Sequence, residues 1–151
     1  MAAGAIIIGF GAPVVSAGAA TRNTSTEMVI HALSTRSYGK ILVDSKGYAL
    51  YTYSRDTKNS SHCSGNCLVV WPALTVASGT TPLGKGVSGL GAIRRSDGTM
   101  QVTYHSLPLY TFASDAKPGQ VTGQGVGGFS VAKVAKTASS PKDTTSGASN
   151  Y

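Results

Sequence analysis

Short runs of β-branched and aromatic residues, separated by turn residues, recur along the middle of the chain. Runs of this length and composition are typical of β-strands. They predict strands over residues 28–33, 39–44, 48–53, 92–95, 100–104 and 129–134. The Asp97-Gly98 pair predicts a hairpin turn between two of these runs. Pro72 restricts the apolar segment 68–74 to a sheet edge or a strand end, and residues 77–91 read as a loop.

One of these runs is written twice in the chain. The two copies, which share the pattern Leu-Tyr-Thr-aromatic-x-x-Asp, are Leu50-Tyr51-Thr52-Tyr53-Ser54-Arg55-Asp56 and Leu109-Tyr110-Thr111-Phe112-Ala113-Ser114-Asp115. Trp71 follows the first Asp, and Phe129 the second, at nearly the same spacing. Such a repeat indicates a duplicated structural unit. We therefore expect an all-β fold, a single domain built from two tandem β-hairpin repeats (about 39–76 and 92–134), forming a pseudo-symmetric sandwich or barrel with long loops.

The repeated strand is expected to lie in the centre of the fold. Side chains alternate between the two faces of a strand, so Tyr51 and Tyr53 share one face while Leu50 and Thr52 share the other. Apolar groups occur on both faces. A strand with this pattern is covered on both sides.

The first residues resemble an export signal. An apolar run over residues 5–15, interrupted by Gly and Pro, is too short to span a bilayer stably. Ala17-Gly18-Ala19 follows as an A-x-A cleavage site, which predicts a signal peptide over residues 1–19. No Lys or Arg precedes the run, so an uncleaved apolar tail is the alternative. We expect no membrane span in the mature chain, which divides into a polar lead-in, a β domain and a disordered tail over residues 20–27, 28–136 and 137–151.

Composition supports export and argues against nucleic-acid binding. Charged residues make up 13% of the chain and Gly occurs 19 times, as in a turn-rich exported β protein. The net charge is +7, but the basic residues are scattered, and Arg94-Arg95 is the only adjacent pair. Phosphate backbones are usually bound by clustered cations. The charge instead favours contact with an anionic cell envelope.

With Tyr51, Tyr53 and Asp56 in one copy, and Tyr110, Phe112 and Asp115 in the other, the chain resembles the bacterial secreted repeat of unknown function, described as predicted lipoproteins with a Yx(FWY)xxD motif. The resemblance spans about residues 39–134 and includes the Cys63/Cys67 spacing before Trp71-Pro72. Two departures are Ser106, where Gly is common, and Phe129, where Trp is common. No lipoprotein Cys follows the small residues either. The resemblance implies a secreted or envelope-associated protein and brings no established activity.

The two cysteines carry the most specific candidate chemistry. In an exported protein, Cys63 and Cys67 are first interpreted as a local disulfide. Such a short loop gains only about 2 kcal/mol and would pin the loop rather than the fold. The alternative is a copper or electron-transfer site, in which His62 or His105 completes a set of soft ligands with Cys63 and Cys67.

The repeated acids are expected to be structural. Asp56 and Asp115 would each accept N–H bonds from the turn that follows; a carboxylate pair for acid/base work or cation binding is the alternative. The Gly-rich segment 123–128 lacks the helix and acidic residue of a dinucleotide site, and no serine-histidine-acid set can be named. The sequence thus predicts an exported, non-enzymatic binding module for an unknown envelope component or protein, without a cofactor; the alternative is a copper-binding or electron-transfer accessory protein.

Overall fold

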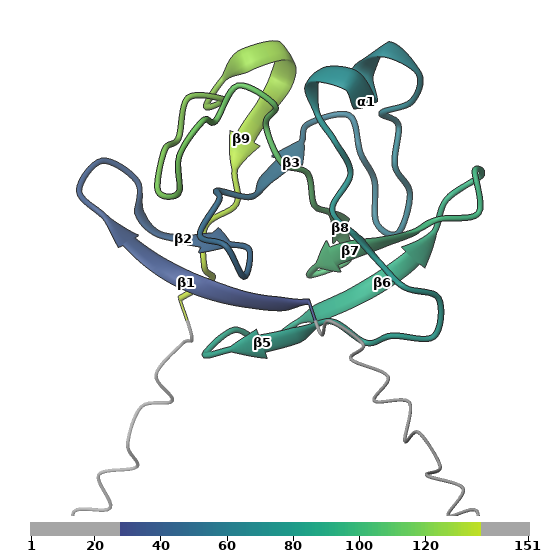
Figure 1. Ribbon diagram of the computed structural model, residues 1–151, viewed down its shortest axis with the longest axis horizontal. Helices are drawn as coiled ribbons and strands as arrows, with labels where there is room; N and C mark the ends of the chain where they lie inside the picture. The colour runs from purple at the N-terminus through teal and green to yellow at the C-terminus, as the bar shows by residue number, and fades with distance from the viewer. Residues whose placement is uncertain (1–27, 137–151) are drawn as a thin grey trace, which may run out of the picture.

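The computed structural model describes residues 28–136, so the predicted signal peptide, lead-in and tail lie outside the described part. Figure 1 shows strands throughout, with one short helix and one 3-10 turn. The elements are β1 (Val29–Thr35), β2 (Gly39–Val43), β3 (Tyr51–Tyr53), α1 (Asn66–Val70), β4 (Thr75–Val76), β5 (Leu83–Lys85), β6 (Leu90–Arg94), β7 (Met100–Tyr104), β8 (Leu107–Pro108), η1 (Val126–Gly128) and β9 (Phe129–Val131). The predicted all-β class is confirmed, with sandwich-like sheets that do not close into a barrel.

Two antiparallel hairpins form the equivalent halves of the fold. In the β1–β2 hairpin Leu33 lies opposite Ile41, and in the β6–β7 hairpin Ile93 lies opposite Gln101. The predicted Asp97 turn joins β6 to β7, because the Asp97 carboxylate accepts the backbone N–H of Thr99. Each hairpin thus opens one half of the fold, although the first hairpin begins with β1, ahead of the predicted start of the first repeat at residue 39.

Each repeat gives its closing strand to the other repeat. β9, at the end of the second repeat, pairs with β3 of the first, with Val131 opposite Tyr51. β4, at the end of the first repeat, pairs with β7 of the second, with Thr75 opposite Gln101. In Figure 1 β9 lies beside β3, far from the hairpin that precedes it in the chain. Neither repeat therefore completes its own sheet.

The two motif tyrosines meet at the centre of this exchange. The backbone N–H of Tyr51 donates to the Tyr110 carbonyl at 2.8 Å, and the N–H of Tyr110 donates to the Tyr51 carbonyl at 2.9 Å. Around them lie two apolar clusters: Tyr51 and Tyr110 belong to one, and Leu50 and Leu109 to the other. Successive residues of the repeated run thus pack into different apolar clusters, as the alternation of side chains along a strand predicts.

Two segments depart from the sequence prediction. The run 68–74 begins in the helix α1 rather than in a strand. A fully apolar run does not distinguish helix from strand, and here the bridge between Cys63 and Cys67 closes the chain into a turn. Residues 77–91 are not all loop, because they contain β5, which runs parallel to β1. All three residues of β5 are exposed. The strand therefore has no buried apolar face, and its sequence lacks the apolar alternation that would predict a strand.

Two further strands are shorter than predicted. The predicted strand 48–53 is shorter, since regular pairing covers only β3. The predicted last strand ends at Val131, although Lys133 still bridges to Ile41. No helix within residues 28–136 is long and apolar enough to cross a membrane.

A tight turn at His105-Ser106 joins β7 to β8. Both residues have positive φ, 47° at His105 and 69° at Ser106, as a type I′ turn requires. Residues with a Cβ rarely adopt this region, because the Cβ crowds the following carbonyl oxygen. The turn is held in place because the Ser106 carbonyl accepts the backbone N–H of Asn59 at 2.7 Å.

We expect Ser106→Gly to stabilise the protein by about 1 kcal/mol, because glycine adopts positive φ without the Cβ penalty. Chemical denaturation of the variant measures the change. Ser114→Gly, on an exposed turn without positive φ, serves as the control and should stabilise nothing. A loss of stability in Ser106→Gly would contradict the strained-turn account.

Candidate functional site

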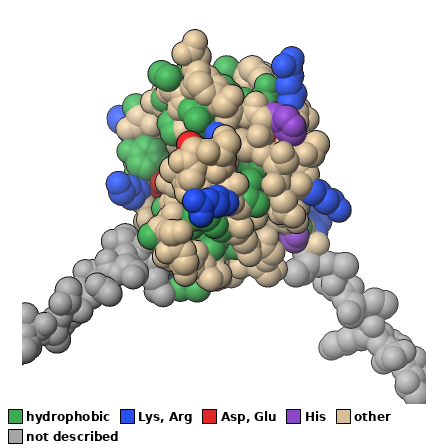
Figure 2. Space-filling model, turned by 90° about the vertical axis from the view of Figure 1, so that its right-hand side faces the viewer, with side chains coloured by type: hydrophobic (Ala, Val, Ile, Leu, Met, Phe, Trp, Pro, Cys, Tyr) green, Lys and Arg blue, Asp and Glu red, His purple; other side chains and the backbone are tan. Residues whose placement is uncertain are grey.

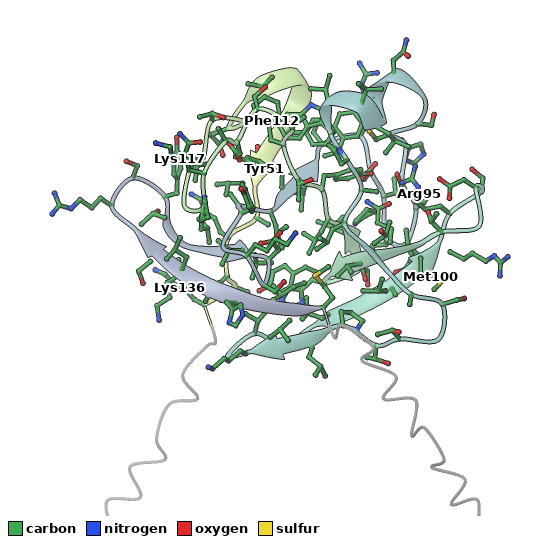
Figure 3. The ribbon with its side chains drawn as sticks, viewed as in Figure 1. Tyr51, Arg95, Met100, Phe112, Lys117 and Lys136 are labelled. Carbon is green, nitrogen blue, oxygen red and sulfur yellow. A yellow bond between two sulfur atoms is a disulfide. The ribbon has the colours of Figure 1, made fainter. Side chains whose placement is uncertain are left out.

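The repeated tyrosines and acids form one buried cluster in which each tyrosine bonds the acid of the other repeat. The Tyr51 hydroxyl donates to Asp115 Oδ2 at 2.7 Å, and the Tyr110 hydroxyl donates to Asp56 Oδ2 at 2.7 Å. Both tyrosines are fully buried and both acids nearly so. Figure 3 shows Tyr51 pointing into the interior of the fold. The motif thus supplies two crossed hydrogen bonds that join the repeats.

The second oxygen of each carboxylate also accepts a hydrogen bond. Asp56 Oδ1 accepts the backbone N–H of His62, and Asp115 Oδ1 accepts the backbone N–H of Thr122. Both donors lie in the loop that follows the acid. Carboxylates that hold a loop on one side and a tyrosine on the other have little capacity left for a substrate or an ion.

The tyrosine oxygens complete the cluster by accepting one bond each. Gly123 N–H donates to the Tyr51 oxygen. The Ser61 hydroxyl lies 2.6 Å from the Tyr110 oxygen. Because the Tyr110 hydrogen points at Asp56, Ser61 is the donor in this contact. Ser61 was not singled out from the sequence, and Gly123 was considered only as part of the Gly-rich segment 123–128, since neither belongs to the repeated motif.

Burial keeps both phenols protonated well above the usual range. The pKa of Tyr110 is raised to about 12, chiefly by burial and further by the hydrogen bond to Asp56, while Ser61 opposes the shift. The pKa of Tyr51 is raised for the same reasons, by burial and by its bond to Asp115. A charged phenolate beside a carboxylate in this interior would be unfavourable.

The second aromatic of each motif copy belongs to a stack of four rings. Tyr53 stacks on Phe129 with ring centroids 4.3 Å apart, Phe129 on Trp71 at 3.9 Å, and Trp71 on Phe112 at 4.4 Å. The order alternates between repeats, so each contact joins one repeat to the other. Phe112 closes the stack at the top of the molecule (Figure 3). Stacked rings add stabilisation beyond their buried area.

A buried arginine breaks the symmetry of the two halves. Arg95 donates to the Ser61 hydroxyl and to Gln101 Oε1 through one nitrogen, and to the Cys63 carbonyl through another. Its Nε lies 3.5 Å from Asp97 without a hydrogen bond to it. Gln101 is fully buried, where the other hairpin has Ile41. This buried polar site was not predicted from the sequence. The available signal was Gln101, a polar residue in the predicted strand 100–104.

The cysteines form the expected disulfide. Cys63 and Cys67 are bridged, with Cα atoms 5.4 Å apart. In this state neither sulfur is a thiolate able to bind copper. His62 is half-exposed beside Asp56, while His105 lies in the turn after β7. Within residues 28–136, no three His, Cys, Asp or Glu side chains gather closely enough to hold a metal ion.

A surface hollow lies away from the motif cluster; we call it the basal cleft. It measures about 870 Å³ and is lined by Ala32 of β1, residues 38–40, 86–88 and 104–105, and residues 133–136 after β9. A second hollow of about 300 Å³ adjoins it and shares Tyr104, His105 and Lys133. Clefts of this size accommodate small ligands. Only His105 among the predicted candidate residues lines it.

The walls of the basal cleft are partly preorganised. The imidazole of His105 packs against the Tyr104 ring, with centroids 4.2 Å apart. A Cβ at Gly89 would come within 2.7 Å of the imidazole, so glycine there keeps room for the ring. The Tyr104 oxygen accepts the backbone N–H of Ala135 at 2.9 Å, which fixes the phenol against the segment after β9. Long-range contacts, not a local motif, assemble this surface.

The crossed hydrogen bonds predict energetic coupling between repeats. In a double-mutant cycle, Tyr51→Phe and Asp115→Asn should be coupled by about 1–2 kcal/mol, because each removes one partner of the same buried bond. Tyr51→Phe and Asp56→Asn, which lie in one motif copy, should be additive to within about 0.5 kcal/mol. Urea unfolding of the variants measures both cycles. The reverse order of couplings would show that the tyrosines bond within their own repeat.

The raised tyrosine pKa values predict a loss of stability in alkali. Below pH 10 both phenols are protonated in the folded and the unfolded chain, so their contribution is complete. As pH rises from about 10 towards 12, the unfolded chain releases these protons first, and the free energy of unfolding falls. Thermal unfolding across this range should show a shallower decline in Tyr51→Phe/Tyr110→Phe. A decline in the double variant as steep as in the unaltered protein would contradict this account.

Comparison with known proteins assigns the chain to a family. A family model described as secreted repeat of unknown function matches residues 32–75 and again residues 91–131. The two matches cover most of both hairpins, and all of both copies of the Tyr-x-aromatic-x-x-Asp motif and both closing aromatics. No curated protein and no solved structure gives a significant match. The crossed tyrosine–aspartate bonds are therefore seen here in a chain that belongs to the family of secreted repeats of unknown function.

Proposed function

We propose that this secreted protein is a non-enzymatic binding module of the cell envelope or its surroundings, and that its ligand occupies the basal cleft. The observation that carries the proposal is the cleft itself, about 870 Å³ in volume and lined by five separate segments of the chain. A hollow lined by segments that are distant in the sequence is formed by the fold as a whole, and a site that is already formed binds with little ordering cost.

The state of the buried acids supports the non-enzymatic part of the proposal. General acid/base chemistry needs a titratable group within reach of a substrate. Asp56 and Asp115 are instead enclosed, with their oxygens bonded to tyrosines and to loop backbone. The copper alternative stays a prediction that requires reduction of the Cys63–Cys67 bridge.

The strain at the rim of the cleft also supports a binding role. His105 lines the cleft with φ of 47°, a conformation that is costly for a residue with a Cβ. Backbone strain of this kind gathers at ligand sites, where surrounding contacts hold it in place. The exposed imidazole is thereby presented to whatever enters the cleft.

A variant that fills the cleft tests the proposal. Ala32, an exposed residue of β1, lines the cleft, so Ala32→Trp should block it without disturbing a core. Thr75→Trp places the same side chain on exposed β4, outside the cleft. Amide shifts are recorded by NMR against a library of cationic, neutral and anionic small molecules. We expect ligands that shift amides of residues 32, 105 and 135, and that bind Thr75→Trp but not Ala32→Trp. Ligands that map only elsewhere, or none at all, would overturn the proposal.

A further inference from the structure

The basal cleft carries positive charge with no negative charge opposite it. Lys40, Lys133 and Lys136 all line the cleft, and no Asp or Glu does. In residues 28–136 the only ion pairs are those of Asp56 with His62 and Asp97 with Arg95. The three lysines therefore have no carboxylate partner in the described part of the chain. Figure 3 shows Lys136 beside β1, well below the motif cluster.

Backbone pairing places Lys40 and Lys133 on neighbouring segments, one residue apart in register. The Val134 N–H donates to the Lys40 carbonyl at 2.9 Å, and Lys133 bridges to Ile41, the next residue of β2. The cations thus come from two adjacent, hydrogen-bonded segments. The face shown in Figure 2 carries basic side chains spread over it, with few acidic ones. Cations that line a hollow without an acidic residue among them create an attractive potential for anions there.

The wall offers one hydrogen-bond donor of the matching kind. The Tyr104 oxygen already accepts from Ala135, and the Tyr104 hydroxyl donates no hydrogen bond to another described residue. That hydrogen is available to a ligand oxygen. The remaining lining includes the apolar side chains of Ala32, Val87 and Val134, which suit a hydrocarbon or aromatic body.

We infer that the basal cleft binds a small organic anion, with its carboxylate or phosphoryl oxygens at the lysines and Tyr104, and its apolar body against Val87 and Val134. This inference rests on the proposed binding function and names the ligand class for the same site. The ligand class follows from charge complementarity and from the unused donor. The ligand is a soluble molecule, because the hollow encloses a volume rather than presenting a flat apolar face.

Calorimetric titration of the full chain tests the ligand class with four probes of graded charge. The probes are 1-naphthyl phosphate, neutral 1-naphthol, cationic 1-naphthylmethylamine and inorganic phosphate. We expect 1-naphthyl phosphate to bind about tenfold more tightly than either 1-naphthol or inorganic phosphate, since it alone offers both charge and an apolar body. The amine should bind most weakly.

Matched charge variants show whether the cleft lysines are responsible. The triple change Lys40→Gln, Lys133→Gln and Lys136→Gln should weaken 1-naphthyl phosphate binding about tenfold. The control triple changes Lys46, Lys58 and Lys117 to Gln, and these exposed residues do not line the cleft. It removes the same charge and should weaken binding less than about twofold. An equal loss in both triples would mean long-range attraction only, and would overturn the inference.

Failure of the ligand class can be told apart from failure of the binding function. Equal binding of 1-naphthol and 1-naphthyl phosphate, both blocked in Ala32→Trp, would keep the cleft as a binding site and overturn its preference for anions. No binding of any probe or library compound at the cleft would overturn both. Binding of phosphatidylglycerol vesicles that depends on the three lysines, without binding of free 1-naphthyl phosphate, would identify a membrane surface instead and overturn the small-ligand inference.

Discussion

The fold depends on two hydrogen bonds that cross between its repeats. Each motif tyrosine reaches the motif aspartate of the other repeat, and the backbones of the two tyrosines pair beside these bonds. A buried carboxylate is tolerated only when its acceptors are satisfied. Neither Asp56 nor Asp115 meets this condition without the partner repeat, so one copy of the motif is incomplete alone. The duplication is thus a requirement of the buried polar chemistry.

The same dependence extends through the rest of the interior. The closing strands β4 and β9 are exchanged between repeats, and the four stacked rings alternate between them. Symmetry is broken where Arg95 and Gln101 replace apolar contacts and fasten the loop that carries the disulfide. The buried charge of Arg95 occurs in one half only, so the two halves differ in their interior although their strands are arranged alike.

The residues that hold the fold together and the residues that line the candidate binding site are different sets. The motif that identifies the family lies in the interior, where its acids and phenols are buried and already hydrogen-bonded to one another and to loop backbone. Free donors and unopposed cations occur instead at the basal cleft, which no motif residue lines. In this protein the repeated motif residues form the buried interior, and residues outside the motif form the candidate binding surface.

Local pattern in the sequence was enough to predict the β class, the duplicated unit, the two-faced strand at Tyr51, the Asp97 turn and the short disulfide. Each of these depends on alternation or on spacing between near neighbours, which the chain displays directly. The tertiary structure alone decided that Tyr51 bonds Asp115 rather than its own motif's Asp56, that exposed β5 joins β1, and that Lys40 meets residues 133–136. These outcomes depend on pairings between distant positions, and the register of such pairings is set by the packing of the whole core rather than by any local pattern.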